Sequence, residues 1–229
     1  MIIRLMSYNV RSLRDDARAV ARVIRSAAPD VVCVQEAPRF LRWRSKCAEL
    51  ARRSGLVVVC GGRPAAANLL MSTLAVDVRA TRDVKFSKDP RLHQRGCAMA
   101  VLAKSGEPFA VVGTHLDLTA EPRLRHVAEL RACADGFRPS EIPLIAAGDI
   151  NEKPGEPAWR ALTEIGTDAF AAVGVGEGKS FPAGNPTRRI DGMFVAAPLK
   201  VLSAEVLDSP DVHVASDHRP LVVEVELAE

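Results

Sequence analysis

A short apolar run, Leu144 to Ala147, is the feature that most restricts how this chain can fold. Such a run, with Ile142 just upstream, predicts a short buried strand. The strand is expected to stop at Gly148, and two polar residues, Asp149 and Asn151, follow it. A carboxylate and an amide at the end of a buried strand can be held rigidly over a cleft, whereas an ordinary Asx turn gives the same local pattern.

The same pattern recurs where other predicted strands end. Strands are expected over 2–10, 31–36, 109–115 and 189–195, and each has a polar, chemically capable residue at or near one end. Because packed sheets can bring several strand ends to one rim, we expect these side chains to be neighbours. The set consists of Asn9, Glu36, His115, Asp149, Asn151, Asp191 and the pair Asp217-His218.

The remaining elements follow from hydrophobic periodicity and turn residues. Helices are predicted over 13–27, 40–55, 122–135 and 156–165, and further strands over 56–60, 68–86 (two strands), 97–103, 142–148, 201–207 and 221–227. The segment 174–186 is rich in Gly and Pro and predicts a loop. Strands outnumber helices and many are antiparallel neighbours, so we expect stacked sheets covered by helices in a single α/β domain spanning 1–229.

Composition places the chain among ordinary globular proteins. Of its 229 residues, 48% are hydrophobic and 26% are charged, and no apolar stretch is long enough to span a membrane. The N-terminus enters a predicted strand directly and does not resemble a signal peptide. Five cysteines without a Cys-x-x-Cys pair favour reduced thiols, and we therefore expect a cytoplasmic location.

The net charge of +3 conceals an uneven distribution along the chain. Residues 1–100 contain 19 Lys and Arg against 8 Asp and Glu, whereas residues 101–229 contain 12 against 20. A basic half favours an anionic partner and an acidic half could hold metal ions, although a solvated basic surface is an equally simple explanation. The strand-end residues offer oxygen ligands and no cysteine, which favours Mg²⁺ or Mn²⁺ and chemistry on phosphate groups.

Six short motifs occur in an order that resembles a known family. They are Ser-Tyr-Asn9-Val, Val-Gln-Glu36, Gly-Thr-His115-Leu-Asp, Gly-Asp149-Ile-Asn151, Arg-Ile-Asp191-Gly-Met-Phe and Ser216-Asp217-His218-Arg-Pro. Together they are similar to the endonuclease/exonuclease/phosphatase superfamily of DNase I-like enzymes. The resemblance implies a four-layer α/β/β/α sandwich of two mainly antiparallel sheets flanked by helices.

The resemblance also implies roles for the metal and the nucleophile. Glu36 would be the principal metal ligand, with Asn9 and Asp217 contributing to the same metal region. Asp149 would orient or deprotonate the attacking water, or His218 would serve as the base instead; the motifs do not decide between them.

Three further residues would assist these groups. Asp191 would hold the far ring nitrogen of His218, Asn151 would hold a phosphoryl oxygen, and His115 would bind phosphoryl oxygens or assist the leaving group. Asp117 is either a supporting acid or a turn residue. His93, His126 and His213 match no motif and are expected on loops or helix surfaces.

Several arginines could bind phosphate or simply face solvent. Arg95, Arg188 and Arg189 are the candidates near the motifs. Arg11 stands where abasic-site endonucleases usually have an aspartate, which sets the chain apart from that branch. Other basic residues, namely Arg14, Arg18, Arg22, Arg25, Arg39, Arg42, Arg44 and Lys46, cluster in the first two predicted helices.

The predicted function is metal-dependent hydrolysis of a phosphate ester, with a nuclease or other phosphodiesterase preferred. The basic N-terminal half favours nucleic acid, whereas 4% aromatic content leaves few side chains to stack on bases. A small-molecule or lipid-headgroup phosphatase or phosphodiesterase is the alternative, and an inactive binding protein of the same fold is the third hypothesis. We expect a monomer that has no membrane span.

Overall fold

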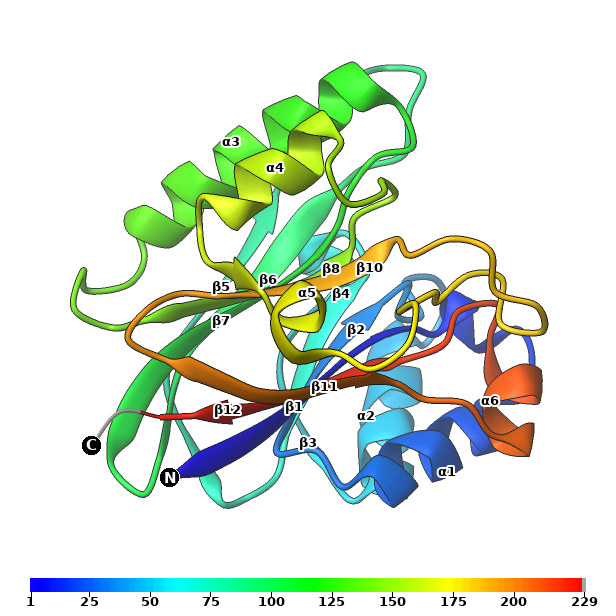
Figure 1. The fold of residues 1–229 in the computed structure, drawn as a ribbon. Coiled ribbons are helices and arrows are strands. Elements are labelled where there is room, and N and C mark those ends of the chain that lie inside the picture. Colours follow the sequence, from blue (N-terminus) through cyan, green and yellow to red (C-terminus); the bar gives the residue numbers. More distant parts are fainter. Residues whose placement is uncertain (228–229) are drawn as a thin grey trace.

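Two six-stranded sheets form the centre of the protein, and the computed structural model describes residues 1–227 (Figure 1). The first sheet contains β1 (Ile2–Asn9), β2 (Val31–Gln35), β3 (Val57–Gly62), β4 (Asn68–Ser72), β11 (Lys200–Val206) and β12 (Leu221–Glu226), in the order β11-β12-β1-β2-β4-β3. The second contains β5 (Val76–Lys85), β6 (Gly96–Lys104), β7 (Glu107–His115), β8 (Leu144–Asp149), β9 (Thr167–Asp168) and β10 (Asp191–Val195), in the order β5-β6-β7-β8-β10-β9.

Helices cover the outer faces of both sheets (Figure 1). α1 (Ala17–Ala27), α2 (Trp43–Ser54) and α6 (Pro210–Ala215) pack on the first sheet, and α3 (Ala120–Asp135) and α4 (Pro157–Thr163) pack on the second. The short helices α5 (Ala169–Val173), η1 (Arg11–Leu13) and η2 (Arg63–Ala65) occupy connections. This arrangement confirms the predicted four-layer sandwich of mainly antiparallel sheets, which is the DNase I-like fold.

Strands that are apolar on both faces explain the layering. In β1, Ile3 and Leu5 point into the core between the sheets, whereas Met6 and Tyr8 point into the core under the helices. Alternating side chains of a strand lie on opposite faces, so a central strand of a four-layer protein needs apolar residues at nearly every position. The apolar runs in the sequence are therefore buried from both sides.

Each sheet contains one parallel pair, and these pairs set the position of the site. β1 pairs with β2, and β7 pairs with β8, each through a connection that carries a helix. His115 lies opposite Asp149 in the β7–β8 pair, and Asp191 lies opposite Asp149 in the β8–β10 pair. The strand pairing therefore places three of the predicted site residues in one row.

The first helices begin later than expected. α1 starts at Ala17 because the Asp16 side chain accepts hydrogen bonds from the N–H groups of Arg18 and Ala19, while the preceding turn has positive φ angles. α2 starts at Trp43, and Phe40, the first residue of the helix predicted over 40–55, lies before it and is 70% exposed. The helical spacing of Phe40 with Trp43 was therefore misleading.

Other differences concern short elements and one histidine. α5, α6 and β9 were not predicted, since each is only 2 to 6 residues long and shows no clear periodicity. His126 is 3% exposed, stacks on Phe86 and bonds to the carbonyl oxygen of Ser87, so its predicted place on a helix surface is wrong. No helix within residues 1–227 is long and apolar enough to cross a membrane.

β8 packs so closely against β7 at Gly148 that any larger residue at this position should destabilise the fold. A Cβ atom added there would lie 2.0 Å from the carbonyl oxygen of Thr114. We expect Gly148→Ala to lower the free energy of unfolding by about 1–3 kcal/mol, measured by urea denaturation. Gly184→Ala is the control, because a Cβ at Gly184 meets no atom within 4 Å. Equal stability of the two variants would contradict the described β7–β8 packing.

Candidate active site

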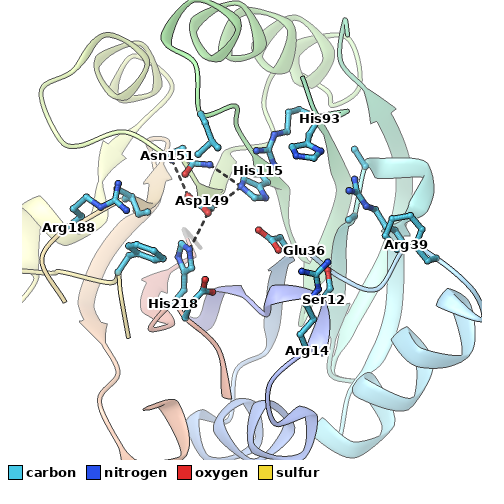
Figure 2. A pocket seen from close by; sticks show the side chains of 18 residues that line it. Ser12, Arg14, Glu36, Arg39, His93, His115, Asp149, Asn151, Arg188 and His218 are labelled. Atoms are coloured by element: carbon cyan, nitrogen blue, oxygen red, sulfur yellow. Dashed lines mark hydrogen bonds and ion pairs between the residues drawn. The ribbon is translucent and has the colours of Figure 1, made fainter. Parts of the chain in front are cut away.

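A cavity of about 500 Å³ lies where the ends of the parallel pairs meet (Figure 2). Six of the eight predicted strand-end residues line it, namely Glu36, His115, Asp149, Asn151, Asp217 and His218. Asn9 and Asp191 are buried directly behind, in contact with lining residues. Sheet ends that are distant in sequence therefore converge as expected.

Asp149 is the centre of this arrangement. Its Oδ2 accepts a hydrogen bond from Asn9 Nδ2 at 3.0 Å and lies 3.3 Å from His115 Nε2 and 3.6 Å from His218 Nε2. Its Oδ1 accepts the backbone N–H of Asn151 at 3.1 Å. The Asx turn considered from the sequence is thus present, and the same carboxylate also serves the cavity.

His218 is held between two carboxylates. Its Nδ1 lies 2.9 Å from Asp191 Oδ2, which also accepts the hydroxyl of Ser180 at 2.5 Å. The ring packs against Phe181, with 4.8 Å between the ring centroids. These contacts fix the orientation of the imidazole and direct Nε2 toward Asp149.

The charge of His218 follows from these neighbours. Burial alone would lower its pKa, but the carboxylates of Asp191, Asp149 and Asp217 outweigh burial and raise the pKa of His218 to about 10. The imidazole of the metal-free protein is therefore protonated at neutral pH, with one N–H donated to Asp191.

His115 has the opposite protonation state. Asn151 Nδ2 donates to the carbonyl oxygen of Leu116 at 3.1 Å, which sets the orientation of the amide, and the same nitrogen lies 3.0 Å from His115 Nε2. An amide nitrogen can only donate, and its 3.0 Å contact with His115 Nε2 is shorter than the 3.3 Å separation of that atom from Asp149 Oδ2, so we place the ring hydrogen on Nδ1. Burial, helped by the positive charges of Arg95 and His218, lowers the pKa of His115 to about 3.

Asn9 connects the two sheets at the cavity, because it bonds to Glu36 at the end of the first sheet and to Asp149 at the end of the second. Asn9 Nδ2 lies 3.3 Å from Glu36 Oε1 and 3.0 Å from Asp149 Oδ2, while Asn9 Oδ1 accepts the N–H of Arg11 at 3.0 Å. Glu36 has a left-handed backbone with φ of 52°, a conformation that a side chain disfavours. Strained backbone at a cavity wall is typical of functional sites.

The donors around Glu36 fit a hard divalent cation. Glu36 and Asp217 both line the cavity, and carboxylate oxygens are the ligands that Mg²⁺ and Mn²⁺ prefer. A second group, Asp149, Asp191 and His218, also offers ligand atoms within 4.8 Å of one another. Since His218 already bonds to Asp191 and faces Asp149, a proton on the ring accounts for that spacing without a cation. Arg11 Nε lies 3.4 Å from Asp217 Oδ2 and partly neutralises this acid.

The structure separates the three arginines proposed near the motifs. Arg95 lines the cavity, 3.6 Å from the buried carboxylate of Asp117, and Arg188 also lines it, with its guanidinium 4.6 Å from the Phe181 ring centroid. Arg189 does not reach the cavity, because it pairs with Asp168 and stacks on Trp159. Its position does not support the predicted contact with substrate.

Several residues of the site were missed from the sequence. Ser180, which is fully buried and holds Asp191, lies in the Gly- and Pro-rich loop and carries no recognisable signal. Arg14, Arg39, Phe40, His93 and Leu118 line the cavity although they were assigned to helices or loops outside it. Only the basic clustering of Arg14 and Arg39 could have suggested their participation.

A family model described as Endonuclease/Exonuclease/phosphatase family matches residues 6–218. The chain belongs to this family, whose members are generally phosphoesterase hydrolases that depend on divalent metal ions. No curated protein matches the sequence significantly.

Solved structures show the same fold at low sequence identity. An endonuclease/exonuclease/phosphatase from Bacteroides vulgatus is 19% identical with a TM-score of 0.83, over 100% of both chains. The mannosyl-6-phosphatase Bt3783 of Bacteroides thetaiotaomicron is 17% identical with a TM-score of 0.84, over 98% of this chain and 100% of the other. TDP2 of D. rerio, solved with a single-stranded DNA product, is 18% identical with a TM-score of 0.74, over 98% and 99%.

The two cavity histidines predict opposite titration behaviour in metal-free protein. We expect ¹⁵N NMR in EDTA to show a neutral His115 with its hydrogen on Nδ1 from pH 8 down to about 4, and a protonated His218 up to about pH 9. A cationic His115 at pH 6 would contradict the tautomer derived from Asn151.

The same shifts affect stability in opposite directions. In the unfolded chain His115 becomes protonated near pH 6.5. The contribution of His115 to the free energy of unfolding is therefore present above that pH and is lost as the pH falls toward 3. The contribution of His218 is present below pH 6.5 and is lost as the pH rises toward 10. His218→Ala should therefore flatten the loss of stability on the alkaline side, measured by urea denaturation in EDTA.

Proposed function

We propose that the protein is a divalent-metal-dependent phosphodiesterase. The observation that carries this proposal is the Asp149 carboxylate, which faces His218 Nε2 across 3.6 Å in a cavity rich in arginine. That separation is too long for a direct hydrogen bond, and it allows both side chains to contact the same oxygen atom of a water molecule or a phosphoryl group. Family membership supports hydrolysis of a phosphoester, and the roles of the individual residues are part of the proposal.

Glu36 would hold the metal, with Asp217 and Asn9 completing its surroundings. When bound, the cation would neutralise charge that develops on the phosphoryl oxygens. Asn9 has a second role. Its Nδ2 bonds both Glu36 and Asp149, and it would so hold the metal-binding carboxylate and the water-activating carboxylate in a fixed relative position.

Asp149 is the proposed base, and His218 is the proposed donor to the phosphoryl group. A base must be unprotonated, and the carboxylates around His218 raise its pKa to about 10, which leaves the ring cationic at neutral pH. Asp149 would accept the proton of the attacking water while His218 Nε2–H donates to a phosphoryl oxygen. We therefore assign the role of base to Asp149, one of the two candidates that the motifs left open.

Asn151 acts as a positioning residue in this proposal. Its Nδ2 donates to the carbonyl oxygen of Leu116 and to His115 Nε2, so the hydrogen on His115 Nδ1 is free to reach a phosphoryl oxygen. The sequence predicted that Asn151 contacts a phosphoryl oxygen directly. In this proposal Asn151 acts on the phosphate through His115 instead. Arg14, Arg39, Arg95 and Arg188 add positive charge around the cavity.

A phosphomonoesterase is the second candidate. Four arginines around one cavity suit a monoester, because its phosphate carries one more negative charge than a diester near neutral pH. Hydrolysis of bis-p-nitrophenyl phosphate and p-nitrophenyl phosphate with Mg²⁺ or Mn²⁺ separates the two candidates. Turnover of the monoester alone would replace the proposed diesterase by a phosphatase.

Removal of either proposed proton-transfer group should abolish most of the activity. We expect Asp149→Asn and His218→Ala to lower kcat on bis-p-nitrophenyl phosphate by about 10²–10⁴-fold, since general acid–base groups contribute on that scale. His213→Ala is a matched control, because His213 also pairs with an aspartate, Asp208, but on the exposed surface outside the cavity. Activity within threefold of the parent in His218→Ala would exclude the proposed mechanism.

Metal binding has a separate test that does not depend on turnover. Titration calorimetry of Mn²⁺ into metal-free protein should show binding that Glu36→Gln weakens by tenfold or more, because the amide lacks the charge of the carboxylate. Glu49→Gln, on a partly exposed part of α2 outside the cavity, should bind like the parent. Unchanged affinity in Glu36→Gln would show that the metal lies elsewhere.

A further inference from the structure

A second hollow, called here the basic groove, continues outward from the cavity. It has a volume of about 580 Å³ and shares Arg39, Phe40 and Ala66 with the cavity wall. The β2–α2 connection, η2 and the end of β5 form its sides. Figure 2 shows Arg39 at the edge of the cavity, away from His218 and Arg188.

All the charged side chains that line the basic groove are positive. Arg39, Arg42, Arg63 and Lys85 line it, together with no Asp or Glu. Within residues 1–227 none of these four cations has a carboxylate within 4.0 Å, whereas other surface arginines such as Arg22 and Arg52 form ion pairs. Unpaired cations held close together repel one another, so the groove favours an anionic ligand.

One aromatic ring in the groove is free to stack. Phe40 is 70% exposed, and the guanidinium of Arg39 lies 5.3 Å from its ring centroid. Trp43 is already engaged, since the Arg44 guanidinium lies 4.3 Å from its ring and the ring edge packs on Gly62. An exposed aromatic ring beside cations without carboxylate partners matches a surface on which a nucleobase stacks while the phosphates contact arginines.

The start of α2 adds to the positive potential. Arg42 is its N-cap and makes no side-chain capping bond, so the positive end of the 12-residue helix dipole faces the groove without an acid to neutralise it. This feature reinforces the four cations and does not define a site by itself.

We propose that the basic groove binds a single-stranded nucleic acid next to the phosphate that is cleaved in the cavity. Arg63 and Lys85 would contact backbone phosphates, and Phe40 would stack on a base. This inference rests on the proposed function, since it names the substrate class that the same site would take.

The shape of the surface separates this ligand from two others. A small phosphate ester would fill the cavity and leave Arg63 and Lys85 without a role. A bilayer presses on protruding surfaces, whereas these cations line a hollow that a flexible strand can enter. A duplex keeps its bases stacked on each other and cannot offer one to Phe40.

Binding can be measured separately from cleavage. Fluorescence anisotropy in EDTA would compare single-stranded DNA, single-stranded RNA and duplex DNA of equal length at several salt concentrations. We expect one of the single strands to bind tighter than the duplex. The double variant Arg63→Ala/Lys85→Ala should weaken single-strand binding at least fivefold and reduce the slope of log K against log[salt] by about 0.7 per lost contact, about 1.4 in all.

Phe40→Ala should weaken binding about 5- to 150-fold with little change in the salt slope, because it removes stacking and no charge. The control Arg79→Ala/Arg160→Ala removes two exposed arginines that lie outside the cavity and the groove. It should bind like the parent. The Arg63→Ala/Lys85→Ala variant should hydrolyse bis-p-nitrophenyl phosphate at the parental rate, since that diester is small enough for the cavity alone.

The outcomes separate this proposal from the proposed function. Parental hydrolysis of bis-p-nitrophenyl phosphate with no single-strand binding, or with binding unaffected by both groove variants, would overturn the groove and leave the phosphodiesterase intact. Single-strand binding that depends on Arg63, Lys85 and Phe40, without hydrolysis of any ester, would support the groove and overturn the function. Tighter binding to vesicles containing anionic lipid than to any oligonucleotide, lost in Phe40→Ala, would show a membrane-docking surface instead and overturn the proposal.

Discussion

The pairing of β8 with its two neighbours is the constraint on which the candidate site depends. β7 runs parallel to β8 and brings His115 opposite Asp149, and β10 runs antiparallel and brings Asp191 opposite the same residue. Residues opposite each other in paired strands point to the same side of the sheet, so backbone hydrogen bonds alone align three functional side chains. A slip of one residue would turn the side chains of a strand to the other face. The tight contact of Gly148 with Thr114 works against such a slip.

From this row the electrostatics of the cavity follow. His218 lies in the connection that leads into β12 of the first sheet. Its ring lies between the carboxylates of Asp149 and Asp191, which make it a cation. His115 shares Asp149 as a neighbour, but burial, together with the positive charges of Arg95 and His218, outweighs that carboxylate and lowers its pKa, so it stays neutral. Two histidines around one carboxylate therefore have different charges, because His218 has further carboxylates beside it and His115 has cations. In the proposed mechanism, His218 would donate to a phosphoryl oxygen as a cation and His115 as a neutral N–H.

The sequence allowed the layered fold and the central residues to be predicted because both depend on strands whose apolar runs are unmistakable. Asp149, Glu36 and His115 directly end or follow such runs, and the motifs of a known family supplied their order. What escaped prediction depends on tertiary contacts between loops. Ser180, which bonds to Asp191, lies in a segment without hydrophobic periodicity. Phe40 has the spacing of a helical residue relative to Trp43, but it lies in the exposed segment before α2. The opposite error occurred for His126, whose burial comes from Phe86 on another element.

The order of the strands along the chain has a consequence for how the protein acquires activity during synthesis. All strands of the second sheet lie between residues 76 and 195, whereas the first sheet draws on residues 2–72 and 200–226. β1, near the beginning, waits for β12, near the end, as one of its two neighbours. Pairings between such distant segments form late, because the intervening chain must first be closed into a loop. Since Asp217 and His218 are made just before β12, a ribosome-bound fragment would carry Asp149 without its partner. The proposed pair of Asp149 and His218 would thus be complete only once β12 had joined β1.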